Sequence, residues 1–360
     1  MEAHTEAIPR PATGPPIGEI LRRQLNRYGL FIFLAALPLY VGIHGLVVDH
    51  NVNALGDDLV TGLSNGAIWA LIAIGYTLVY GIIELINFAH GDVFMIGSFT
   101  AAALYGTLGV TLATGTLGVI GGLLVILVIA MLVCGALNVC IEKVAYRPLR
   151  NAPKLAPLIT AVGFSFILQN VGLLWLGGSP ASVPDVLRQD QTVFHLFGVA
   201  VSRGELLALG LTIPLVFAMS AFINRSRLGK AMRATAQDPE AARLMGINVD
   251  TTISLTFLIG GMLAGAAGLI FALYETTIWF FQGFRGGLFA FTAAVMGGIG
   301  NVRGAVIGGL IIGVVQAISD SSDFPGLGPQ WTDAVVFAFL IIVMIFRPQG
   351  LLGEETREAG

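Results

Sequence analysis

Long apolar segments separated by short polar ones dominate the chain. A helix needs about 20 apolar residues to cross a bilayer, and most of the segments approach or exceed that length. The pattern therefore predicts about eight transmembrane helices, the last of them somewhat short. The expected spans are residues 29–48, 59–84, about 93–108, 116–138, 155–176, 206–223, 253–274 and 333–346.

A ninth apolar segment, residues 289–319, is interrupted by glycines. Asn301 and Arg303 lie at its middle, and Gly297, Gly298 and Gly300 come just before them. Breaks in membrane helices are tolerated only inside protein or beside water. We expect two short helices that meet at a polar break bordering a water-filled path. A re-entrant hairpin and two thin full spans both remain open, and an internal repeat is expected.

Composition assigns the chain to the polytopic all-α membrane proteins. Of its 360 residues, 55% are hydrophobic and only 11% are charged, whereas soluble domains carry about a quarter charged residues. The net charge of −3 gives no reason to expect nucleic acid as a partner. Cys134 and Cys140 are six residues apart on one predicted helix, so they do not face each other, and neither a disulfide nor a metal pair is indicated.

The distribution of basic residues orients the spans. Lys and Arg are concentrated in residues 22–27, 142–154 and 225–243, whereas residues 49–58 and 177–204 are acidic loops. Basic loops stay in the cytoplasm, so both termini are expected there. The predicted organisation begins with a disordered cytoplasmic tail, residues 1–28, followed by one transmembrane domain, residues 29–347. A polar loop, residues 225–250, lies within this domain, and a second cytoplasmic tail, residues 348–360, follows it.

Polar and aromatic residues share one face of the second predicted span. Asn65, Trp69, Tyr76, Tyr80 and Glu84 are separated by four, seven, four and four residues, which is helical spacing. A seam between helices and a face toward a translocation path explain this equally well.

Asn87, His90 and Asp92 follow that span and join the candidate path residues. For His90 with Asp92, a pair that anchors a loop is favoured over a proton relay.

The segment Arg233–Asn248 is a polar island between two apolar spans. Asp238 can cap a helix, Pro239 suits its first position, and Glu240 sits at its positive end. Gly246 then ends the helix about two turns later, with a positive φ. The segment predicts a short, capped cytoplasmic helix, with an ordinary solvated loop as the alternative.

Sites for ATP hydrolysis or metal binding are missing from the sequence. There is no G-x-x-x-x-G-K-[ST] phosphate loop, so any ATP-driven activity requires a separate ATPase chain. The histidines are scattered, and neither a Ser-His-Asp set nor a carboxylate pair stands out. No cofactor is expected in this chain.

Several segments resemble one transporter family. Glu240-Ala241-Ala242 followed by Gly246 resembles the coupling-helix motif of ABC importer permeases, although the Leu-Pro that often closes that motif is missing. Asn87–Gly97, Phe291–Gly300 and Tyr76–Gly81 resemble segments of the branched-chain amino-acid permeases of that class. The resemblance covers about residues 59–350 and leaves residues 1–50 unexplained.

The resemblance implies a permease subunit of an importer in the bacterial inner membrane. Its expected partners are a second, similar permease, two ATP-binding subunits and a periplasmic substrate-binding protein. The residues expected to couple the chain to the ATPase are Arg233, Asp238, Pro239, Glu240, Ala241, Ala242 and Gly246.

Other readings stay open. Permeases for urea, short amides or simple sugars belong to the wider family. An ion-coupled secondary transporter would also have broken helices, but intramembrane carboxylates are few, with Glu84 and Glu275 near span ends. A channel is a weaker possibility.

Overall fold

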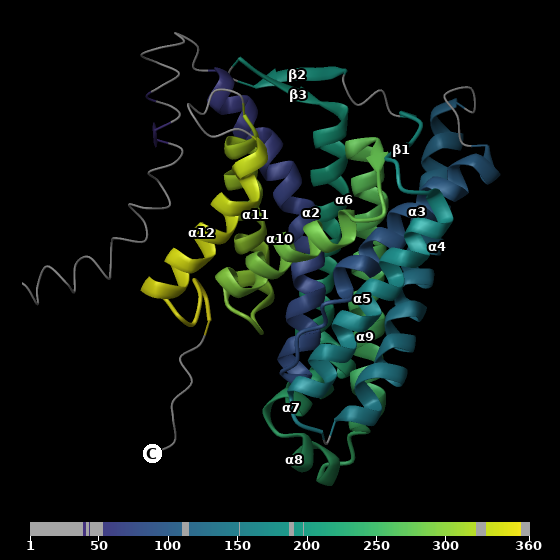
Figure 1. The fold of residues 1–360 in the computed structure, drawn as a ribbon, viewed down its shortest axis with the longest axis vertical. Helices are drawn as coiled ribbons and strands as arrows, with labels where there is room; N and C mark the ends of the chain where they lie inside the picture. Colours follow the sequence, from purple (N-terminus) through teal and green to yellow (C-terminus); the bar gives the residue numbers. More distant parts are fainter. Residues whose placement is uncertain are drawn as a thin grey trace, which may run out of the picture.

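The computed structural model describes residues 39, 40, 43, 53–109, 115–150, 152–186, 191–196, 198–321 and 329–353. Over these residues the chain is a bundle of long helices (Figure 1). The helices are α2 (Asn53–Ile83), α3 (His90–Leu108), α4 (Gly115–Ile141), α5 (Leu155–Leu176), α6 (Arg203–Arg225), α7 (Arg227–Gln237), α8 (Pro239–Leu244), α9 (Val249–Glu275), α10 (Gln282–Gly297), α11 (Val302–Asp320) and α12 (Thr332–Phe346).

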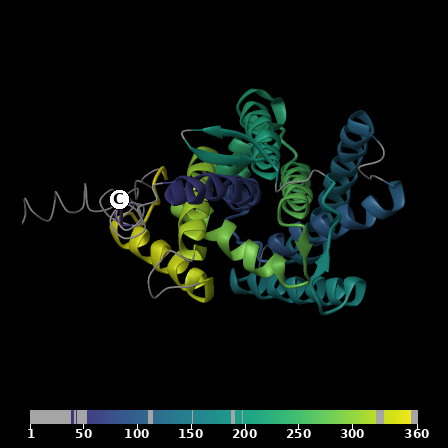
Figure 2. The same ribbon diagram turned by 90° about the horizontal axis from the view of Figure 1, so that it is seen from above.

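Seven helical segments of the described part are long and apolar enough to cross a membrane. They contain α2, α4, α5, α6, α9, α11 and α12, while α3 and α10 complete the bundle. This confirms the predicted all-α polytopic class. The expected span 29–48 lies outside the described residues except for Leu39, Tyr40 and Ile43. Seen from above, α12 and α4 lie toward opposite ends of an elongated molecule (Figure 2).

Glycine allows the central helices α2 and α11 to touch backbone to backbone. A β-carbon added to Gly313 would lie 2.2 Å from the backbone nitrogen of Gly66, and one added to Gly66 would lie 2.7 Å from Cα of Leu310. In lipid there is no hydrophobic driving force between helices, so small residues favour association by letting the two backbones pack closely. The α2–α11 pair therefore forms a tightly packed contact, and α10 packs against both of these helices.

The glycine-rich segment is a helical hairpin. α10 ends at Gly297 and α11 begins at Val302, and the turn between them contains Gly298 and Gly300 with φ of 107° and 92°. Of its two arms, α11 is long and apolar enough to cross a membrane, whereas α10, with 16 residues, is not among the candidate spans of the described residues. The re-entrant hairpin and the pair of full spans both stay predictions.

The acidic loop 177–204 contains three strands. β2 (Thr192–Leu196) and β3 (Val199–Ser202) form an antiparallel hairpin. β1 (Ala181–Ser182) pairs with β4 (Thr277–Ile278), which follows α9, in the register Ala181 to Ile278. This pairing ties the two outer connections together at the top of Figure 1.

Two irregular features complete the opposite side of the molecule. α4 continues into a π-helix, η3 (Glu142–Tyr146), and a 3-10 turn, η4 (Arg147–Leu149). Residues 350–353, here called the C-terminal strap, pack on the break between α10 and α11. The Leu351 and Leu352 amides donate to the carbonyls of Met296 and Gly297 at 2.8 and 2.9 Å. The first part of the predicted tail is therefore packed with the domain.

Candidate functional site

The start of α3 lies inside the bundle. The chain leaves α2 at Ile83 and turns back, so that the ring of His90 packs edge-on against Tyr76, with centroids 4.8 Å apart. His90 and Asp92 are fully buried. A β-carbon on Gly91 would lie 2.3 Å from the Gly283 carbonyl oxygen, so α10 crosses α3 at this point. Polar residues at the start of α3 thus lie in the protein interior.

A buried hydrogen-bonded chain joins α5 to Asp92. The Gln169 amide donates to the Ser165 hydroxyl at 3.0 Å, and that hydroxyl donates to the Asp92 carboxylate. His90 meets the Tyr76 ring instead, so the structure does not bring His90 and Asp92 together as a loop-anchoring pair. Residues i and i+2 of a helix point in different directions. Asp92 therefore links α3 to α5, and the arrangement can hold a carboxylate within the membrane interior.

Asn87 belongs to a second buried network. Its amide donates to Asn138 of α4 at 3.1 Å, and the Asn138 amide donates to the Phe257 carbonyl of α9 at 2.7 Å. The Tyr146 hydroxyl donates to the Ile86 carbonyl at 3.1 Å. This network fixes the segment between α2 and α3 to two other helices.

The polar face of α2 turns inward over most of its length. Asn65, Trp69 and Tyr76 are buried and Tyr80 is half-buried. The Trp69 indole donates to Gln316 of α11 at 2.7 Å. These contacts form a seam between helices, and the role of the same face in a translocation path stays a prediction.

Glu84 follows the end of α2. It is exposed, adopts a left-handed φ of 51°, and pairs with Lys154 at 3.0 Å.

The glycine break lies beside the end of α2. A β-carbon on Gly81 would lie 3.6 Å from Cα of Gly300, which is itself exposed. The Asn301 side chain caps α11 by accepting from the amides of Arg303 and Gly304, and it donates to the Leu352 carbonyl at 2.8 Å. Asn301 thus closes the turn and holds the strap, while Gly297 and Gly298 are in contact with α11 and the strap.

The polar island forms the capped helix that its sequence predicts. The Asp238 carboxylate accepts from the amides of Glu240 and Ala241, both at 2.9 Å, and Pro239 is the first residue of α8. Gly246 has a φ of 84°. Ala242 faces inward, whereas Leu244 and Met245 are 89% and 83% exposed. Leu244, the last residue of α8, and Met245, which follows it, therefore present bare apolar side chains. The α8 ribbon is at the lowest point of the molecule in Figure 1.

α7 is a helix in its own right, which the sequence reasoning missed. Ser226 ends α6 and caps α7 by accepting from the Gly229 amide at 2.8 Å. The signal was a serine followed by helix-forming residues. Arg233 lies on α7, where its guanidinium donates to the Ile223 carbonyl at the end of α6. It therefore braces α6 against α7 and is not part of α8.

A buried carboxylate network at the base of α4 was also missed. Glu142 has no exposed side-chain surface, pairs with Arg150, and accepts from the Ser254 hydroxyl at 2.7 Å. Asp250 pairs with Arg150 and, at 3.0 Å, with Arg147. The sequence pattern of the basic cluster indicates only orientation, although Glu142 at its edge is a signal for ion pairing.

Comparison with known proteins identifies the family. The family model described as "Branched-chain amino acid transport system / permease component" matches residues 59–344. The chain belongs to this family.

The chain is similar to named permeases of this family over most of its length. It is 43% identical to the high-affinity branched-chain amino acid transport system permease protein BraD of Pseudomonas aeruginosa, covering 83% of this chain and 96% of that one. It is 41% identical to LivH of Escherichia coli with the same coverage. The fructose import permease protein FrcC of Rhizobium meliloti is 26% identical over 53% of this chain and 54% of its own.

Family membership and the seven apolar helices make the chain a multi-pass inner-membrane permease subunit. Among solved structures, PsaBC from Streptococcus pneumoniae aligns over 86% of this chain and 97% of that one, at 14% identity and a TM-score of 0.44.

Proposed function

We propose that this chain forms half of the membrane path of an ATP-driven importer for branched-chain amino acids. The observation that carries the proposal is the similarity to permeases of that name, which extends over 96% of their length. The fructose permease matches only about half of each chain at lower identity, so an amino-acid cargo is favoured over a sugar.

The energy for transport comes from other subunits in this proposal. The sequence contains no phosphate loop, and α8 offers a short, rigid helix with exposed Leu244 and Met245. Such a helix can fit a groove on an ATPase and transmit its movement. The proposed complex contains this chain, a second permease of similar fold, two ATP-binding subunits and a periplasmic binding protein that delivers the amino acid.

The proposed orientation places α7, α8 and both termini in the cytoplasm. Basic residues are concentrated at that end, in residues 142–154 and 225–243, and such loops stay inside. Reporter fusions after residue 28 and after residue 353 should both give a cytoplasmic signal. A periplasmic signal from either fusion contradicts this topology.

Reconstitution tests the function directly. Proteoliposomes with all proposed subunits should accumulate leucine only when ATP and the binding protein are present. Liposomes with this chain alone should show no uptake under a proton or sodium gradient. Gradient-driven uptake by the chain alone would instead identify an ion-coupled secondary transporter. Uptake of fructose but not leucine would contradict the proposed amino-acid substrate.

A single substitution tests the docking role of α8. Leu244 is exposed and contributes little to the fold, so Leu244→Asp should leave the chain stable in the membrane. It should reduce co-purification of the ATP-binding subunits and abolish ATP-driven uptake, because a carboxylate cannot enter an apolar groove unpaired. Unchanged ATPase recovery would show that α8 is not the docking element.

A further inference from the structure

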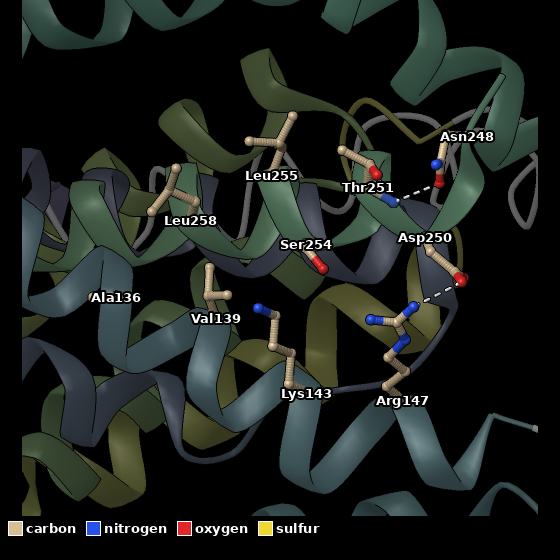
Figure 3. A pocket seen from close by; sticks show the side chains of 10 residues that line it. All are labelled: Ala136, Val139, Lys143, Arg147, Asn248, Asp250, Thr251, Ser254, Leu255 and Leu258. Carbon is tan, nitrogen blue, oxygen red and sulfur yellow. Dashed lines mark hydrogen bonds and ion pairs between the residues drawn. The ribbon is translucent and has the colours of Figure 1, made fainter.

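A groove opens between the lower ends of α4 and α9. It has a volume of about 560 Å³. Ten residues line it, from α4 and its irregular continuation on one side and from the start of α9 on the other: Ala136, Val139, Lys143, Arg147, Asn248, Asp250, Thr251, Ser254, Leu255 and Leu258 (Figure 3).

The groove is polar at one end and apolar at the other. Ala136, Val139, Leu255 and Leu258 line its inner end, and Lys143 lies one to two helical turns beyond them. Arg147, Asn248 and Thr251 continue the polar end. This order matches a molecule with a charged head and a hydrocarbon tail, aligned with the helices.

One positive charge in the groove is not neutralised. Asp250 is paired with Arg147 and Arg150, and the buried Glu142 is paired with Arg150, so both carboxylates are occupied. Lys143 has no ion-pair partner among the residues that the structure describes. Its ammonium extends into the space between the helices, on the side of Ser254 (Figure 3). The local charge therefore favours an anion.

Exposed apolar side chains flank the groove. Leu132, Val133 and Val144 of the same helical segment are exposed apolar residues above and below it. In a membrane protein such side chains face hydrocarbon, and basic pockets between helices at the membrane boundary suit anionic headgroups. A soluble anion would leave the apolar half empty, whereas an acyl chain fills it.

We propose that this groove is a binding site for an anionic phospholipid. The phosphate lies at Lys143, and one acyl chain lies along Val139, Leu255 and Leu258. The proposal does not depend on which substrate the transporter carries.

Photo-crosslinking tests the site. The purified full-length chain in nanodiscs is exposed to phosphatidylglycerol or phosphatidylcholine, each carrying the same diazirine acyl chain, and labelled peptides are mapped by mass spectrometry. Phosphatidylglycerol should label residues 136–147 and 248–258 in preference to phosphatidylcholine. Equal labelling by the two lipids, or labels spread evenly over the outer helices, overturns the proposal.

Two variants and a matched control sharpen the result. Lys143→Gln should reduce the preference for phosphatidylglycerol about fivefold, the factor that one basic residue near a charged lipid surface supplies. Ala136→Trp should block labelling in the groove without changing charge. Lys154→Gln is the control, because Lys154 is exposed near the same end of the bundle but is paired with Glu84. A preference unchanged in Lys143→Gln, or lost equally in Lys154→Gln, contradicts a specific site.

Two further arms exclude other occupants. Glycerophosphoglycerol, the headgroup without chains, should not compete at the concentration of the lipid. Full competition would show a site for soluble phosphate esters. Labelling should also persist in the complex with the proposed second permease, and its complete loss there would show that the groove is covered by protein.

Discussion

Asn138 bridges two parts of the chain through opposite ends of one amide. Its carbonyl accepts from Asn87 at 3.1 Å, and its amino group donates to the Phe257 carbonyl of α9 at 2.7 Å. Because Asn138 is fully buried, neither partner can turn to water when the amide is removed. The turn before α3 is thereby fixed to α4 and α9 at one point.

Asn138→Ala should destabilise the protein by about 1–2 kcal/mol, the range of hydrogen bonds between helices in membranes. The measurement is the unfolding midpoint of the purified chain in detergent. Asn224→Ala is the control, because Asn224 is exposed and donates to the Ser220 carbonyl one turn back. Equal midpoints for the two variants would show that the bridge contributes nothing.

Gly313→Ala should weaken the α2–α11 contact. The new methyl would lie 2.2 Å from the Gly66 nitrogen and 2.3 Å from the Gly62 oxygen, and overpacking of this kind costs about 1–3 kcal/mol. Gly121→Ala on α4 meets no atom within 4 Å and should leave stability unchanged. Thermal unfolding of both variants in the same detergent checks the difference.

Gly246→Val should abolish ATP-driven uptake while the chain still inserts in the membrane. The backbone there has a φ of 84°, and a side chain would enter open space, so the cost arises from conformation alone. A left-handed residue costs about 1–2 kcal/mol, less for asparagine than for β-branched residues. Gly246→Asn should therefore retain most uptake. Equal loss in both variants would mean that glycine is needed for another reason.

Removal of residues 350–360 should loosen the break between α10 and α11. The strap supplies two backbone hydrogen bonds to Met296 and Gly297 and accepts a third from Asn301. Removal of residues 354–360 leaves these bonds intact and is the matched control. Hydrogen exchange at residues 296–304 should rise only in the longer deletion, and equal exchange in both would show that the strap does not hold the turn.

Local chemistry made several elements predictable. Asp238, Pro239 and Gly246 act within one or two turns of each other, so the capped helix α8 could be read from the sequence. The apolar run 155–176 coincides with α5 for the same reason. In such cases the residues that determine the structure are neighbours in the chain.

Long-range pairing could not be predicted in this way. Asn87 and Asn138 are both buried polar residues near span ends, but nothing local indicates that they face each other. The strap similarly depends on residues about fifty positions away. β1 and β4 are two residues each and are held by their pairing, so neither carries a strand pattern of its own. The groove beside Lys143 could not be predicted for the same reason, because its two walls come from helices that are far apart in the sequence.

The π-helix at the base of α4 sets the rotational register of the short helical segment that follows it, up to Arg150. A π turn contains one residue more than an α turn, and one residue corresponds to about 100° of rotation in an α-helix. Deleting one residue between Glu142 and Tyr146 would therefore restore α-helical winding and swing the following side chains about a quarter turn. Tyr146 would lose its hydrogen bond to the Ile86 carbonyl, and Arg150 would lose its ion pair with Glu142. These five residues thus set the angle at which the ion-paired side chains follow the membrane helix.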